Sequence, residues 1–148
     1  MSVGRICTRE VDLAAADETV LGAARRMRDE RVGTLVILNE AREPIGLVTD
    51  RDLVVRVLVA GKDPQTTRVG HVMTQDLRVI SEESPIEAAL ALMRAAAVRR
   101  LPVVDRLGKL VGIVSLDDVL ELLVEEFGHI GRILERQRTA AAGRAGSG

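Results

Sequence analysis

The segment GLVTDRD at residues 46–52 combines a glycine, an apolar pair, a threonine and two aspartates, and it nearly recurs as GIVSLDD at residues 112–118. The second copy lies 66 positions after the first, and the same shift brings Met27 onto Met93. Because this offset holds without a gap from residue 3 to residue 118, the chain contains an internal duplication. Two copies are too few for a longer repeat array, so the sequence predicts a pseudo-twofold pair of units.

The sequence predicts the same order of helices and strands for each copy. The first copy is expected to form a helix after Asp17, strands at 34–39 and 45–49, and a helix ended by Gly61. The second copy is expected to form a helix opened by Ser84 and Pro85, strands at 101–105 and 110–115, and a helix from Leu116. With a strand before the first helix, each unit is an α/β (α+β) strand–helix–strand–strand–helix unit, and the two are expected to pack sheet to sheet.

The predicted boundaries are residues 1–62 for the first unit, 63–127 for the second, and 128–148 for a helical extension and tail. From Leu116 onward, apolar residues recur on one face of a long helix, which Gly128 and Gly131 are expected to loosen or kink. That face either covers the core or pairs with a second copy of the chain, and the sequence leaves both open. Beyond Thr139, the segment AAAGRAGSG has the composition of a disordered tail.

Composition excludes several classes of protein. Of the 148 residues, 47% are hydrophobic, but there is no Trp or Tyr and one Phe, so the core must be aliphatic. The net charge of −1 gives no broad attraction to nucleic acid or membrane surfaces. The single cysteine, Cys7, excludes a disulfide framework and a thiolate metal cage. With no signal-like N-terminus and no apolar run near the ~18 residues of a membrane span, the protein is expected to be cytoplasmic.

The two aspartate motifs fit ligand binding better than catalysis or metal binding. Neither motif has a histidine or nucleophile in register, and His71 and His129 lie in no ligand-spaced pattern, so no enzyme and no metal site is predicted. A strand glycine permits close approach, and a Thr or Ser before a helix offers a hydroxyl and amides to a phosphate. Capping alone would explain Asp50 and Asp117, whereas Asp52 and Asp118 recur at one site, where they could accept hydrogen bonds from ribose hydroxyls.

The paired motif G-apolar-apolar-[S/T]-x-x-D, the element order and the segment VRRLPVVD at 98–105 resemble the cystathionine-β-synthase (CBS) domain. Two such domains in tandem resemble a Bateman module, and the resemblance covers residues 3–125. The segment TDRDLVVRVLVAGKDPQT at 49–66 is similar to stand-alone bacterial two-CBS proteins, including the mycobacterial hypoxic-response type. The resemblance implies two pseudo-symmetric sites for adenosyl ligands, namely AMP, ADP or ATP, with S-adenosylmethionine or NAD as alternatives and no required cofactor.

The resemblance also implies which residues form these sites. For the second-copy site they are Asp118 on the ribose, Ser115 and Arg100 on the phosphate, and Thr8, Val32 and Gly33 beside the adenine. For the first-copy site they are Asp52 on the ribose, Thr49, Arg51 and Thr34 on the phosphate, and Thr74, Val98 and Arg99 beside the base. Two features depart from the pattern: Asp117 would repel a polyphosphate, and Gly33-Thr34 lacks the basic pair Arg99-Arg100, which could instead be a solvated strand edge paired with acids.

These observations predict a regulatory module that senses adenine nucleotides as a homodimer and acts on an unidentified protein partner, without nucleic acid or membrane. The alternative is a ligand-free CBS scaffold whose role is dimerisation.

Overall fold

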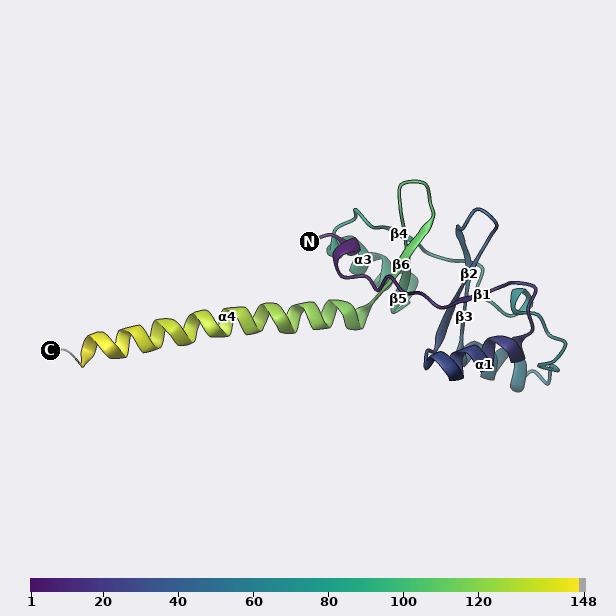
Figure 1. The fold of residues 1–148 in the computed structure, drawn as a ribbon, viewed down its shortest axis with the longest axis horizontal. Coiled ribbons are helices and arrows are strands. Elements are labelled where there is room, and N and C mark those ends of the chain that lie inside the picture. The colour runs from purple at the N-terminus through teal and green to yellow at the C-terminus, as the bar shows by residue number, and fades with distance from the viewer. Residues whose placement is uncertain (147–148) are drawn as a thin grey trace.

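The computed structural model describes residues 1–146 and contains two three-stranded sheets, each packed against helices, with one long helix projecting from the body (Figure 1). The elements of the first copy are η1 (Val3–Arg5), β1 (Leu13–Ala14), α1 (Val20–Glu30), β2 (Thr34–Leu38), β3 (Pro44–Thr49), α2 (Asp50–Leu53) and η2 (Val54–Leu58). Those of the second are η3 (Val69–His71), β4 (Ile80–Ser81), α3 (Ile86–Ala96), β5 (Arg100–Val104), β6 (Leu110–Ser115) and α4 (Leu116–Ala145). The predicted fold class and element order are confirmed.

The two sheets have the same topology. In each, a short first strand pairs in parallel with the central strand, which pairs antiparallel with the third. Leu35 lies opposite Val48 in the first sheet, and Leu101 lies opposite Val114 in the second. All four of these side chains are fully buried, so each sheet places its central apolar pairs in an aliphatic core.

Each core is completed by a segment from the other copy. Val3 is fully buried among second-copy residues, and its amide donates to the Ser84 carbonyl at 2.8 Å. In the same way Val69 is fully buried in the first core, and its amide donates to the Glu18 carbonyl at 2.9 Å. The duplicated units therefore exchange their N-terminal turns, η1 and η3, so the boundary predicted at residue 62 divides the repeats but not the packing units.

The strand glycines Gly46 and Gly112 accommodate the protein's own chain. A Cβ built on Gly112 would lie 2.7 Å from the Thr8 carbonyl oxygen, because Thr8 pairs with Ile113 through two 2.9 Å backbone hydrogen bonds. A Cβ on Gly46 would lie 2.5 Å from the sulfur of Met73. The prediction that these glycines admit a ligand is wrong, because the exchanged segments make the close approach instead.

The helix α4 is longer than the sequence indicated. It has 30 residues, continues unbroken through Gly128 and Gly131, and reaches Ala145 (Figure 1). The prediction of a disordered tail beyond Thr139 is therefore wrong for residues 140–145, where alanine and arginine are strong helix formers, and residues 147–148 lie outside the described part. No helix within residues 1–146 has the length and apolarity needed to cross a membrane.

Candidate functional site

Asp52 and Asp118 cap the helices that follow the third strand of each sheet. The Asp118 carboxylate accepts from the Ser115 amide at 2.7 Å, and the Asp118 amide donates to the Ser115 hydroxyl at 3.1 Å. Asp52 makes the same reciprocal pair with Thr49, at 2.9 Å and 3.1 Å. Each pair is a capping box that satisfies two backbone amides. Asp50 and Asp117 lie in the first turn of these helices, as predicted, but the recurring aspartates Asp52 and Asp118 form the capping boxes.

Capping leaves part of the second-copy motif free. Asp118 uses Oδ2 in its cap, and within residues 1–146 its Oδ1 has no ion pair or hydrogen bond. The Ser115 hydroxyl accepts from Asp118 but can still donate its own hydrogen to a ligand. Structural and ligand-binding roles are therefore compatible at this position.

A cavity of about 330 Å³ opens in front of Asp118. Its lining contains all six residues implied for the second-copy site: Thr8, Val32, Gly33, Arg100, Ser115 and Asp118. It also contains Thr34, which the resemblance assigned to the other site. Five further residues of the lining were not indicated by the sequence: Glu10, Val11, Asp12, Arg31 and Ile113. The exchanged N-terminal segment brings Thr8, Glu10, Val11 and Asp12 to this cavity. The alignment of the two copies does not by itself indicate this placement.

The corresponding first-copy cavity, of about 440 Å³, does not reach Asp52. Its lining consists of Leu47, Thr74, Asp76, Leu77, Arg78, Ala95, Ala96, Val98 and Arg100. Thr74 and Val98 are therefore brought together as the resemblance implied. Thr34, Thr49, Arg51, Asp52 and Arg99 are absent from this lining.

The side chain of Arg56 lies between Asp52 and Thr74. Its guanidinium donates to the Val72 carbonyl at 2.7 Å and to the Thr74 hydroxyl at 3.4 Å, and lies 3.8 Å from Asp52 Oδ1. The residue 66 positions later is Leu122, which cannot make these contacts. The protein's own cation thus contacts the first-copy motif, and the residues that match between the two copies give no indication of this contact.

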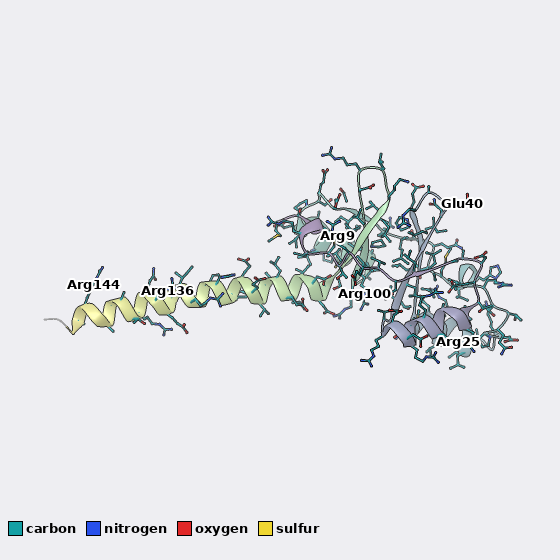
Figure 2. All side chains as sticks on the ribbon, viewed as in Figure 1. Arg9, Arg25, Glu40, Arg100, Arg136 and Arg144 are labelled. Atoms are coloured by element: carbon teal, nitrogen blue, oxygen red, sulfur yellow. The ribbon has the colours of Figure 1, made fainter. Side chains whose placement is uncertain are left out.

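The two arginines before Leu101 have different surroundings. Arg99 lies 3.5 Å from Asp117, with both side chains about two-thirds exposed, as expected of a solvated strand edge. Arg100 lines both cavities, and within residues 1–146 its guanidinium has no hydrogen bond or ion pair. Figure 2 shows Arg100 near the point where α4 leaves the body. Of the pair, Arg100 is therefore the one free to bind an anion.

The charges of the two cavities also differ. The Asp118 cavity contains three carboxylates, on Glu10, Asp12 and Asp118, and two guanidinium groups, on Arg31 and Arg100. The first-copy cavity contains one carboxylate, on Asp76, and two guanidinium groups, on Arg78 and Arg100. A ligand with several negative charges is therefore opposed in the Asp118 cavity.

Cys7 lies next to Thr8, beside the Asp118 cavity. Burial raises the pKa of its thiol, an effect that the nearby Arg9 opposes and Glu82 reinforces. The thiolate is the reactive form, and a raised pKa means that less thiolate is present at mildly alkaline pH. The rate of Cys7 alkylation should therefore increase as the pH rises toward the pKa of the thiol. We expect iodoacetamide to alkylate Cys7 about tenfold more slowly in the folded protein than in urea. Equal rates in the two conditions would contradict this environment for Cys7.

Comparison with known proteins identifies two matched segments. The family model described as CBS domain matches residues 3–58 and 69–125. A curated protein of Methanopyrus kandleri is 39% identical over 122 residues, which are 82% of this chain but 62% of that protein. Hypoxic response protein 1 of Mycobacterium tuberculosis is 34% identical over 125 residues, which cover 84% of this chain and 82% of that protein.

Solved structures share the fold. The crystal structure of Hypoxic Response Protein I, with two coordinated zinc ions, has a TM-score of 0.74 and 31% identity, covering 82% of this chain and 98% of that chain. The CBS domain pair of protein MJ0100, in complex with 5-methylthioadenosine and S-adenosyl-L-methionine, has a TM-score of 0.75 at 22% identity, covering 85% and 98%. In this chain, no three His, Cys, Asp or Glu side chains of residues 1–146 cluster as a metal site would require.

Proposed function

Because this chain belongs to the CBS-domain family and carries two copies of the domain, a regulatory ligand-binding module, we propose that it senses adenine nucleotides. The nucleotide binds in the cavity in front of Asp118. The observation that carries this proposal is that two groups at that cavity, Asp118 Oδ1 and the Arg100 guanidinium, have no hydrogen bond or ion pair within residues 1–146.

The cavity offers complementary groups to each part of a nucleoside monophosphate. Asp118 Oδ1 accepts from the ribose hydroxyls, as a carboxylate in a charge-assisted hydrogen bond. The Arg100 guanidinium and the Ser115 hydroxyl contact the phosphate. Val11, Val32 and Ile113 provide an aliphatic slot for the base, since the chain has no aromatic residue there.

The ligand carries one phosphate rather than three. Three carboxylates line this cavity against two guanidinium groups, and Asp117 lies in the first turn of α4 beside Ser115. Additional phosphates would meet net repulsion, so AMP is favoured over ATP. In the first copy, Arg56 contacts the equivalent motif. The protein therefore binds one nucleotide per chain.

Isothermal titration calorimetry with AMP, ATP, NAD and S-adenosylmethionine tests the proposal directly. One AMP per chain, bound more tightly than ATP, supports it. Absence of heat with all four ligands, together with native mass spectra showing no co-purified nucleotide, would leave the ligand-free scaffold as the function.

The role of Arg100 can be separated from general effects of charge. We expect Arg100→Ala to weaken AMP binding by about tenfold, while adenosine, which has no phosphate, binds the variant and the wild type alike. Arg99→Ala is the matched control, because it removes a neighbouring arginine that pairs with Asp117. If Arg99→Ala weakened AMP binding as much as Arg100→Ala, the assignment of Arg100 to the phosphate would be wrong.

A further part of the proposal is that the protein works as a homodimer and passes nucleotide occupancy to a protein partner. Large apolar side chains are exposed on η2 and the residue after it, namely Val54, Val55, Leu58 and Val59, and along α4. Such patches mark interaction surfaces in soluble proteins.

A further inference from the structure

The exposed face of α4 has the spacing of a coiled coil. Apolar or small residues recur at alternating steps of four and three, with one polar exception, Gln137: Leu116, Leu120, Leu123, Phe127, Ile130, Leu134, Gln137 and Ala141. Along this seam and beside it, seven large apolar side chains are exposed, each by 45% or more: Leu120, Leu123, Val124, Phe127, Ile130, Ile133 and Leu134. An a/d seam of this kind is the pattern by which one helix packs against another.

Nothing in the rest of the described chain covers this face. The matched second CBS domain ends at residue 125, whereas α4 continues to Ala145 and projects from the body (Figure 1). Figure 2 shows Arg136 and Arg144 on this projecting part, far from both sheets. A helix that exposes such a stripe to water gains its stability from a partner helix.

Charge is distributed unequally along α4. Its first part carries only acidic charge, from Asp117, Asp118, Glu121, Glu125 and Glu126. Residues 132–138 are predominantly basic, with Arg132, Arg136 and Arg138 against Glu135. Two such helices attract each other when they run antiparallel, and place acids beside acids when they run parallel.

We propose that α4 pairs antiparallel with α4 of a second copy of this chain. In the register that best aligns the seams, Phe127 lies beside Ile130 of the second copy and Leu123 beside its Leu134. The same register places residues 117–126 of one helix, which carry the acids, alongside residues 131–140 of the other, which carry most of the basic side chains. Both halves of each stripe are then covered, including the apolar residues next to the body.

Gly131 of α4 lies where this register needs space. Gly128 and Gly131 flank the midpoint of the pair, and a Cβ on Gly131 would meet no atom within 4 Å. Glycine is a poor helix former, so two glycines in an exposed helix have no local benefit. At the crossing point Gly131, which follows Ile130 of the seam, gives room to the Phe127 ring of the second copy.

Light scattering of full-length variants tests whether α4 forms the interface. Wild type should appear at twice the 16.0 kDa chain mass, and Phe127→Glu combined with Ile130→Glu should weaken dimerisation at least about tenfold. Both sites are more than half exposed, so the fold should survive, which circular dichroism would check. The control is Val54→Glu with Leu58→Glu on the other apolar patch. A monomeric wild type, or a dimer lost only in the control, would overturn the proposal. Nucleotide binding is measured separately and does not affect this outcome.

Disulfide trapping tests the orientation. In a Cys7→Ser background, Leu123→Cys and Leu134→Cys are made in separate chains, which are then mixed and oxidised. The antiparallel pair predicts cross-linking in the mixture and little in either variant alone. Cross-linking of each variant with itself would show a parallel pair and overturn the proposed orientation.

Discussion

Asp118→Ala is expected to weaken AMP binding by about 10- to 100-fold, because it removes the carboxylate that accepts from the ribose. Asp52→Ala, the equivalent change in the first copy, is expected to leave AMP binding within about twofold of wild type. The expected difference arises from Arg56, whose guanidinium lies 3.8 Å from Asp52 Oδ1 and would compete with a ribose for that oxygen. Calorimetry on both variants provides the measurement.

The two variants are matched because both aspartates cap a helix. Each substitution removes a capping box, so each should lower the free energy of unfolding by about 1 kcal/mol. Thermal denaturation would show this common loss, and only the loss of affinity should distinguish the variants. Equal loss of affinity in both would mean that Arg56 does not close the first-copy site. No loss in either would show that neither aspartate holds the ribose.

The duplication made the fold predictable from sequence. A constant offset of 66 residues aligned α1, β2 and β3 with α3, β5 and β6, so each weak local pattern was supported by a second copy. The burial of Leu35, Val48, Leu101 and Val114 follows from short apolar runs that are typical of buried strands. The exchange of η1 and η3 between the cores was not predictable, because periodicity does not show which core receives a buried turn.

The sequence indicated the features that the two candidate sites share, but not the differences between them. The residues implied for the second-copy site line one cavity, and the resemblance to the family indicated them, because Thr8, Val32 and Gly33 lie far from Asp118 in the sequence. The differences arise at positions where the copies disagree, such as Arg56 against Leu122 and Asp12 against Arg78. Comparing mismatched positions across the offset would have indicated both the closed motif and the different charges of the two cavities.

The exchanged segments also explain how the body supports the ligand cavity, and Gly112 is where this can be tested. Gly112→Ala places a Cβ against the Thr8 carbonyl, which is backbone and cannot move without breaking the pairing with Ile113. We expect the free energy of unfolding to fall by about 1–3 kcal/mol, as measured by urea denaturation. Because Thr8 lines the Asp118 cavity, AMP affinity should fall as well.

Gly46→Ala is the control for this steric argument. Its new Cβ would meet the side chain of Met73, which has three rotatable bonds and can move aside. The loss should therefore be less than about 1 kcal/mol, with AMP affinity unchanged. If the two alanine variants were equally stable, the backbone pairing of Thr8 would not limit Gly112. If Gly112→Ala lost stability but kept full AMP affinity, the N-terminal segment would complete the second core without shaping the cavity.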